Sequence, residues 1–500
     1  MGNAQRNVMG TPPLDYLITT LVRTLGESEF VLRFPAVVWG VLGIALTFVL
    51  ARRVTGSRGI AYSAALLFAC APLLVHFAQE ARFYSLPICL SLLVVYVFGR
   101  AWQQPRAWRW ALFGLATLIA LFPHYYTLLV IGALVLGGII ASLPFFTDRA
   151  RDLPRAWSSL AVALLVPGIA LVLWMMGQGF TGPGEFGFAP PTLFDVIAAP
   201  VTSGYRESPF HLVTMQVLGI VVLPFLAVIG LGDSLRARRS SGVLLALIVG
   251  IGAAGVLFAD WRAQYFYTAR QLLFVVPFYL ILVAAGLDVL MRVVLRRSTW
   301  AAAGTIVALG LMLAVFALSL QRYYDVPKDD WRSAARLIAS AASRTPNTYL
   351  SAPNGLEQYL TFYESSLAPH RIAEEQLPPR IEEARVWVVN WGNDTPRVVE
   401  TLKQGARWRV LPLAVSPNLY LWYAGAAKEE QLWRELAALD LPPQVLAYSN
   451  VLPPMQAIDA RLAQQVTQRS IALMQTMRPP LLDVPKARFW RRIQRMPTGE

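Results

Sequence analysis

Residues 76–98 read HFAQEARFYSLPICLSLLVVYVF. This stretch begins with a His, a Glu, an Arg and a Tyr within a few residues, yet residues 59–79 and residues 83–99 contain no Asp, Glu, Lys or Arg. An apolar run of about 20 residues is long enough to cross the hydrocarbon core of a membrane as a helix. The pattern therefore predicts two membrane-spanning helices joined by a short charged loop.

The whole chain has the composition of a membrane protein. A soluble domain carries about 25% charged residues, whereas this 500-residue chain carries 15%, with 56% hydrophobic residues and a mean hydropathy of +0.47. We therefore predict a mainly α, polytopic membrane helical bundle of about ten spans with a smaller C-terminal α/β extracytoplasmic domain. The predicted spans are residues 36–51, 60–76, 84–99, 107–122, 126–146, 157–176, 211–232, 241–259, 271–290 and 301–320.

The expected organisation has four parts. They are a first outer loop at residues 1–33, a transmembrane domain at 34–320, an outer α/β domain at 321–426 and a helical, proline-broken extension at 427–500. The outer domain is predicted from one helix at 331–342 and from β-type runs at 348–352, 384–391 and 408–424. In the extension, residues 488–496 are basic and aromatic, and they fit either a contact with anionic lipid or a solvated tail.

The loops between the predicted spans alternate in charge. Every second loop is rich in arginine, and the loops between them contain few basic residues. The basic loops are predicted to be cytoplasmic, because short cytoplasmic loops carry an excess of Lys and Arg. The first loop holds Arg52, Arg53 and Arg58, the third Arg100, Arg106 and Arg109, the fifth Arg149, Arg151 and Arg155, the seventh Arg236, Arg238 and Arg239, and the ninth Arg292, Arg296 and Arg297.

This orientation places residues 1–33 and the region after Gln321 outside. Residues 1–16, MGNAQRNVMGTPPLDY, have no apolar core of the kind that a signal peptide needs. We therefore expect a further transmembrane helix upstream of Met1. The alternative is a short N-terminus that crosses the membrane without such a helix.

Several classes of function are disfavoured. The net charge of +14 lies largely in short loops between apolar runs and not on one soluble face, so we expect no nucleic-acid binding. Cys70 and Cys89 both lie in apolar runs and offer neither a disulfide framework nor a metal-ligand spacing. The sequence has no glycine-rich phosphate loop and no nucleophile elbow, which argues against a nucleotide-driven pump.

The predicted outer loops carry the candidate chemistry. Glu80 and Arg82 fit either the roof of a polar cavity or a helix-end salt bridge beside Tyr84 as an interfacial anchor. The loop at 260–271, DWRAQYFYTARQ, adds two arginines on the predicted outer side of the membrane, where basic residues are uncommon. The arginine side chain is suited to bidentate binding of phosphate. Its alternative is an aromatic belt with incidental charges. Residues 122–127, FPHYYT, fit interfacial packing better than a catalytic base.

These residues resemble a known family. HFAQEARFYSLPICLSLLVVYVF is similar to the second outer loop and helix of the membrane glycosyltransferases with the C-type fold, in the bacterial branch related to protein mannosyltransferases (glycosyltransferase family 39). Residues 11–46, TPPLDYLITTLVRTLGESEFVLRFPAVVWGVLGIAL, resemble the first outer loop of that family. Residues 265–287, YFYTARQLLFVVPFYLILVAAGL, resemble its late arginine-containing loop. Residues 323–339, YYDVPKDDWRSAARLIA, resemble the start of its outer domain.

The resemblance implies transfer of a sugar from a polyprenyl-phosphate carrier to a lipid, glycan or protein acceptor outside the inner membrane of a bacterium. It implies a carboxylate as general base, arginines that stabilise the departing phosphate, and in some members a divalent cation such as Mg or Mn. The candidate catalytic residues are Glu80, which matches the family directly, and Asp15, a substitute carboxylate. The resemblance implies that Arg82, Tyr84, Tyr267 and Arg270 bind substrate, and the outer loops add His124, Tyr125 and Arg262 as further candidates.

The first outer loop departs from the family pattern. The family has a charged residue before the Pro pair and an aromatic residue after the Leu, and this chain has Thr11 and Asp15 there. The acidic motif of the family is expected upstream of Met1, so Asp15 is a candidate substitute carboxylate.

Two other classes of function stay open. A transporter or flippase for a lipid-linked saccharide would show internal repeats and helices broken near the middle of the membrane. The sequence shows no repeat, and its polar groups cluster at one edge. A non-catalytic membrane scaffold is favoured if the acidic motif is absent.

Overall fold

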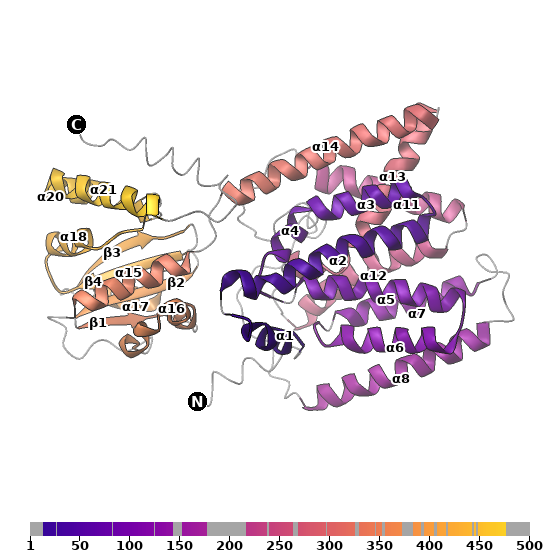
Figure 1. Cartoon of the computed structure of the whole chain (residues 1–500), viewed down its shortest axis with the longest axis horizontal. Coiled ribbons are helices and arrows are strands. Elements are labelled where there is room, and N and C mark those ends of the chain that lie inside the picture. Colours follow the sequence, from indigo (N-terminus) through magenta and orange to yellow (C-terminus); the bar gives the residue numbers. More distant parts are fainter. Residues whose placement is uncertain are drawn as a thin grey trace. The chain divides into compact units, whose positions relative to one another are not determined.

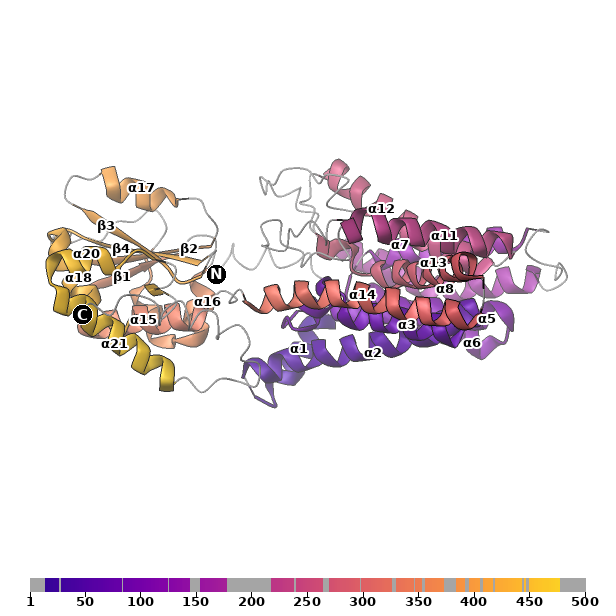
Figure 2. The ribbon, with the colours of Figure 1, turned by 90° about the horizontal axis from the view of Figure 1, so that it is seen from above.

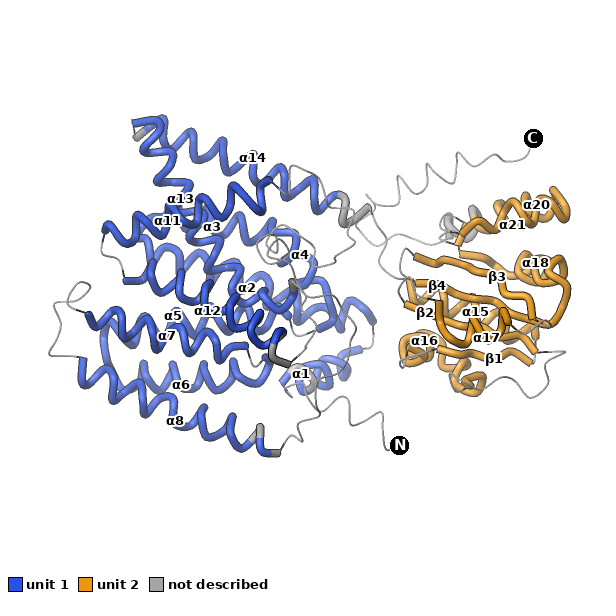
Figure 3. Tube along the Cα trace, turned by 180° about the vertical axis from the view of Figure 1, so that it is seen from behind, with its two compact units in different colours: residues 1–323 blue, residues 324–500 orange. Residues whose placement is uncertain are grey.

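The computed structural model divides the chain into two compact units, residues 1–323 and residues 324–500 (Figure 3). The structure describes residues 14–26, 28–82, 84–124, 126–143, 153–177, 217–237, 240–263, 269–296, 298–325, 330–345, 347–352, 356–372, 384–391, 395–404, 408–416, 419–442, 445–446 and 449–476.

The first unit is a bundle of long apolar helices that lie side by side (Figure 1). Its elements are α1 (Leu14–Arg23), α2 (Glu29–Thr55), α3 (Arg58–Cys70), α4 (Pro72–Ala78), α5 (Ser85–Gln103), α6 (Ala107–Leu121), α7 (Thr127–Ala141), α8 (Leu153–Gly177), the π-helical turn η4 (Leu218–Val222), α11 (Leu223–Arg236), α12 (Ser240–Ala263), the 3-10 turn η5 (Ala269–Leu272), α13 (Val276–Leu295) and α14 (Ser298–Asp325).

The membrane bundle predicted from the sequence is confirmed. Among the described residues, seven helices are long and apolar enough to cross a membrane, or eight if the bent pair α3–α4 forms one span. The helices α6 and α7 are apolar but shorter, and they occupy two further predicted spans. The number of ten spans therefore stays a prediction.

The span predicted at residues 60–76 is not one straight helix. The helices α3 and α4 meet at an angle of 60°. The break lies at Ala71, which has φ −60° and ψ 119°. The following residue is Pro72, and a proline disfavours helical geometry in the residue before it. The bend lets α4 carry the chain as far as Ala78 before the polar loop begins.

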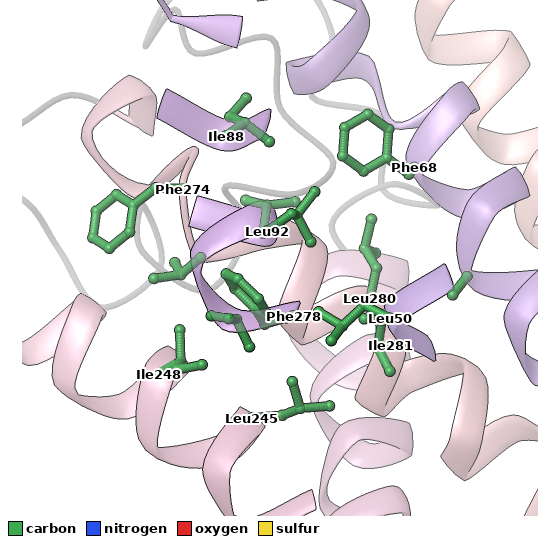
Figure 4. Packing of buried hydrophobic residues seen from close by; sticks show 14 of the residues in the cluster. Leu50, Phe68, Ile88, Leu92, Leu245, Ile248, Phe274, Phe278, Leu280 and Ile281 are labelled. Carbon is green, nitrogen blue, oxygen red and sulfur yellow. The ribbon is translucent and has the colours of Figure 1, made fainter. Parts of the chain in front are cut away.

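The core of this unit is built around α5 and α13. In the most apolar 18-residue stretch of each helix, 72% of the residues of α5 and 50% of those of α13 are buried. The corresponding share is 22% in α8 and in α14. Buried side chains of α2, α3, α5, α12 and α13 interdigitate between the helices (Figure 4). The loops that precede α5 and α13 are therefore attached to the most firmly packed helices of the bundle.

The second unit contains a four-stranded mixed sheet, which confirms the small α/β part of the predicted fold. Its strands are β1 (Thr348–Ser351), β2 (Arg385–Trp391), β3 (Arg409–Ala414) and β4 (Leu419–Gly425), in the order β1-β2-β4-β3. The pair β1–β2 is parallel and the other pairs are antiparallel. Its helices are α15 (Trp331–Arg344), α16 (Glu357–Tyr363), the 3-10 turn η7 (Ser365–His370), α17 (Arg397–Gln404), α18 (Glu429–Ala438), α20 (Leu452–Ile458) and α21 (Ala460–Thr476).

Successive side chains of β2 point to opposite faces of the sheet and pack into two separate hydrophobic cores. Trp387 and Val389 pack with α15, α18 and α21 on one face, and Val386 and Val388 pack with α17 on the other (Figure 2). The helix α15 begins at Asp330, whose carboxylate accepts a hydrogen bond of 3.0 Å from the backbone N–H of Ser333. The basic, aromatic run at 488–496 lies outside the described residues.

A partly buried ion pair between Arg385 of β2 and Glu435 of α18 joins the helix to the sheet. The Arg385 side chain donates hydrogen bonds of 2.7 and 2.6 Å to the two carboxylate oxygens of Glu435, and the Tyr423 hydroxyl donates a third of 2.7 Å. Burial alone would raise the pKa of Glu435, but these hydrogen bonds outweigh burial and hold that pKa below its ordinary value. The ion pair stabilises the second unit most fully when Glu435 is ionised.

Candidate active site

A pocket lies at the end of the bundle where α5, α7 and α13 begin. It encloses about 270 Å³, part of which is open to solvent. Three segments far apart in the sequence line it: the start of α5, the link between α6 and α7, and η5 with the residues after it. The lining residues are Tyr84, Pro87, His124, Tyr126, Thr127, Arg270, Gln271, Leu273 and Phe274.

Arg270 supplies a positive charge to this pocket. It lies on η5, directly before the deeply buried run that leads into α13. Its guanidinium carbon is 5.8 Å from the ring centroid of Tyr84, which is a cation–π distance. The Tyr84 ring is 8% exposed and also packs against Phe77 of α4, with 4.7 Å between the ring centroids. The aromatic contacts therefore hold the arginine at the pocket wall.

His124 supplies a neutral polar group. The backbone N–H of Tyr126 donates a hydrogen bond of 3.2 Å to its Nδ1 atom. Because Nδ1 accepts, the neutral ring carries its proton on Nε2 and offers a donor there. Burial and the positive charge of Arg270 together lower the pKa of His124 to about 4. His124 is therefore uncharged at neutral pH, and the field of Arg270 in this pocket favours an anion.

Glu80 and Arg82 lie beside the pocket and are not among its lining residues. The Nε2 atom of His76, on α4, is 3.1 Å from Oε1 of Glu80, whose side chain is 21% exposed. The Arg82 side chain is exposed, and its Nη1 donates a long hydrogen bond of 3.5 Å to the Tyr84 hydroxyl. Arg82 thus contacts Tyr84 of the pocket wall, and Glu80 contacts His76, whose ring packs against Phe77.

Of the nine site residues predicted from the sequence, the structure brings Tyr84, His124 and Arg270 into one pocket. Asp15 lies on α1 and Arg262 on α12, but their side chains lie outside the described part of the chain. Tyr125 and Tyr267 lie outside the described residues altogether. The roles of these residues stay predictions.

Three further polar residues of this region were not in the predicted set: His76, Gln271 and Thr127. His76 stands four residues before Glu80, the spacing of neighbours on one helix face. Gln271 directly follows Arg270, and Thr127 is the first residue of α7, where its hydroxyl donates a hydrogen bond of 2.9 Å to the carbonyl of Ala120. Only the His76 spacing gave a signal that sequence reasoning could have used.

In the described part of the chain, no group of three or more His, Cys, Asp or Glu side chains is arranged to hold a metal ion. The candidate carboxylate of Asp15 lies outside that part. A requirement for Mg or Mn therefore stays a prediction.

Comparison with known proteins identifies the architecture. Residues 10–174 match the family model described as dolichyl-phosphate-mannose-protein mannosyltransferase. Among curated protein sequences, no match is found.

Solved structures with the same fold include ArnT from Cupriavidus metallidurans. Its apo structure is 14% identical, with a TM-score of 0.51, covering 83% of this chain and 88% of that chain. The structure of ArnT bound to undecaprenyl phosphate is 15% identical, with a TM-score of 0.51, covering 84% and 88%. A weaker similarity, with a TM-score of 0.47 and 14% identity, is to the oligosaccharyltransferase of Archaeoglobus fulgidus, covering 73% of this chain and 53% of that chain. With its bundle of apolar helices and its small mixed sheet, the chain is a membrane protein with the C-type glycosyltransferase fold.

Proposed function

We propose that this chain transfers a sugar from a polyprenyl-phosphate-linked donor to a lipid, glycan or protein acceptor. The observation that carries the proposal is the pocket that joins Arg270, Tyr84 and neutral His124. Arginine binds phosphate oxygens in a bidentate manner.

The proposed reaction breaks the bond between the anomeric carbon of the sugar and an oxygen of the carrier phosphate. An acceptor hydroxyl attacks that carbon, and its proton passes to a carboxylate, for which Glu80 and Asp15 are the candidates. The carrier leaves as polyprenyl phosphate with one more negative charge. Arg270 and the Nε2–H of His124 stabilise that charge as it develops, which lowers the barrier of the transfer.

The relatives support the class of carrier. ArnT has been crystallised with undecaprenyl phosphate, and the matching family model is named for dolichyl-phosphate-mannose. A mannosyl donor is therefore one candidate among several sugars. The alternation of basic loops supports an orientation in which the pocket and the second unit face outward from a bacterial inner membrane.

The test is sugar transfer by the full chain in proteoliposomes, with labelled polyprenyl-phosphate sugars as donors and membrane lipids, glycans or peptides as acceptors. We expect Arg270→Gln to lower the transfer rate by about 100-fold or more, which is the effect of removing one stabiliser of a developing anion. Arg270→Lys should retain part of the rate, because it keeps the charge and loses the bidentate geometry.

Arg292→Gln is the matched control. Arg292 lies near the other end of α13 and is paired with Asp288, so transfer should be unchanged. Binding of polyprenyl phosphate without transfer of any sugar would contradict the proposal and favour a transporter. Absence of both binding and transfer would favour a scaffold.

A further inference from the structure

A second cluster of cations lies at the opposite end of α5 from the pocket. Arg53 at the end of α2, Arg100 near the end of α5, and Arg106 and Arg109 at the start of α6 form it. The charges of Arg100 and Arg109 act on Arg53, and those of Arg100 and Arg106 act on Arg109, so the four arginines are close enough to repel one another. This set is called the arginine cluster below.

No acidic side chain in the described part of the chain pairs with the arginine cluster. Between Phe30 and Thr147 the sequence contains a single acidic residue, Glu80, which lies at the pocket end of the bundle. The positive charge of the cluster is therefore left for a partner outside these helices.

Neutral groups hold the two more buried members in place. The Nη2 atom of Arg53 donates hydrogen bonds of 3.3 Å to the carbonyl of Gly99 and 2.5 Å to the side chain of Gln103. The Nη1 atom of Arg109 donates hydrogen bonds of 3.3 and 2.5 Å to the carbonyl and the side chain of Gln104. Amide and carbonyl oxygens orient a guanidinium without cancelling its charge, so the arginines are pre-positioned for an anion.

Arg109 has hydrogen-bonding capacity that the described residues do not fill. It is 6% exposed, and its Nε atom has no hydrogen-bond partner among the described residues. Arg106 is the N-cap of α6 and makes no side-chain capping hydrogen bond. Cations are disfavoured at the positive end of a helix dipole, whereas an anion there is stabilised by both the dipole and the guanidinium groups.

The outer surface of α6 indicates which kind of anion. Trp108, Leu112, Leu115 and Ile119 are 57%, 44%, 53% and 40% exposed, and their spacing of three and four residues puts them on one face. This apolar stripe begins beside Arg109, whose guanidinium carbon is 5.1 Å from the ring centroid of Trp108. A small inorganic anion would not contact this apolar stripe. A phospholipid could contact both features, with its phosphate at the arginines and an acyl chain along the stripe.

We propose that the arginine cluster binds the phosphate of an anionic phospholipid, with an acyl chain along Trp108, Leu112 and Leu115 of α6. Basic pockets between transmembrane helices on the cytoplasmic side bind anionic headgroups in this way. The basic loops predict that this end of the bundle faces the cytoplasm. The site is separate from the pocket at Arg270 and does not depend on the proposed transfer reaction.

The test uses the full chain purified in detergent. Native mass spectrometry counts retained lipid, and thermal unfolding is followed with added phosphatidylglycerol, phosphatidylcholine or inorganic phosphate. We expect phosphatidylglycerol to bind and to raise the melting temperature, and the other two to have little effect. Arg106→Gln should weaken phosphatidylglycerol binding about fivefold, since each arginine near a membrane surface contributes about 1 kcal/mol.

Two variants keep the test decisive if removing a charge disturbs folding or orientation. Arg109→Lys retains the charge and should still weaken binding, because the geometry beside Trp108 is lost. Trp108→Ala changes an exposed side chain and should shorten lipid retention. Arg292→Gln, which changes a basic residue in the last turn of α13, is the matched control and should bind like the unaltered chain. Two results would overturn the proposal. One is equal stabilisation by phosphatidylcholine or by inorganic phosphate; the other is unchanged phosphatidylglycerol binding in Arg106→Gln, Arg109→Lys and Trp108→Ala.

Discussion

The Nε2 atom of His76 lies 3.1 Å from Oε1 of Glu80, one helical turn further along the chain. His76 is 2% exposed on α4, whereas the Glu80 side chain reaches the surface of the loop that precedes Tyr84. The Glu80 carboxylate therefore lies against a buried imidazole next to the pocket.

We expect Glu80→Gln to lower the rate of sugar transfer about tenfold to 100-fold, which is the range from a lost charged contact to a lost general base. His76→Phe fills a similar volume and releases Glu80, so it should lower kcat severalfold with little change in the KM for the donor. His76→Gln should restore most of the rate, because an amide can still donate to the carboxylate. The measurement is steady-state transfer in proteoliposomes.

Asp288→Asn is the control for these variants, because Asp288 is a paired acid of α13 remote from the pocket. If His76→Phe and His76→Gln behaved alike while Glu80→Gln lost activity, His76 would have no role in positioning Glu80.

Tyr84 is expected to hold Arg270 through its ring and not through its hydroxyl. The guanidinium carbon is 5.8 Å from the ring centroid, and a cation–π contact of this kind is worth about 0.5–2 kcal/mol. Tyr84→Leu should therefore weaken binding of undecaprenyl phosphate about fivefold, as measured by titration of the detergent-solubilised chain. Tyr84→Phe keeps the ring and should bind normally. A loss of binding in Tyr84→Phe would assign the effect to the hydroxyl that Arg82 contacts.

The stability of the first unit should depend on pH through His124. Its pKa is lowered from 6.5 to about 4, so the unfolded chain takes up a proton at this residue before the folded chain does. This contribution to stability is fully present above about pH 6.5 and is lost as the pH falls towards 4, with a total of roughly 3 kcal/mol. Thermal unfolding between pH 7 and pH 4 measures it, and His124→Asn should give a shallower decrease. An equal decrease in this variant would show that other groups control the acid sensitivity.

The grouping of three loops at one end of the bundle could be predicted because charge and hydropathy act over whole segments. The alternation of basic loops put the loops around Tyr84, His124 and Arg270 at one end of the bundle, and the structure places these three residues in one pocket. No contact between individual side chains was needed for that inference. The short β-type runs beside a helix predict a small α/β domain, whereas the mixed pairing of its strands is seen only in the structure.

The parts that could not be predicted depend on local geometry. After the bend at Ala71, α4 runs to Ala78, and the loop that follows brings Oε1 of Glu80 to within 3.1 Å of Nε2 of His76. From the sequence, HFAQEARFYS was interpreted as a loop between two straight helices, which hides that spacing. Glu80 lies beside the pocket and not within it. This position depends on side-chain packing, which a pattern of residue types does not predict.

The close approach of α11 and α13 gives the last prediction. A Cβ atom at Gly230 would collide with the carbonyl oxygen of Leu282 and would lie 2.9 Å from the backbone nitrogen of Gly286. A Cβ atom at Gly286 would collide with the carbonyl oxygen of Leu226. Small residues let membrane helices pack backbone against backbone in this way. Because the obstructing atoms belong to the backbone, the helices themselves must separate to admit a methyl group.

We therefore expect Gly230→Ala and Gly286→Ala each to destabilise the bundle by about 1–3 kcal/mol, the usual cost of overpacking. Gly232→Ala is the matched control on α11, since no atom lies within 4 Å of its added Cβ. That variant should be neutral or slightly stabilising, because alanine is the better helix former. Thermal unfolding in detergent ranks the three variants. Because α13 follows directly from the segment that holds Arg270, the two destabilised variants should also bind undecaprenyl phosphate more weakly, whereas normal binding in both would show that the pocket tolerates a shift of α13.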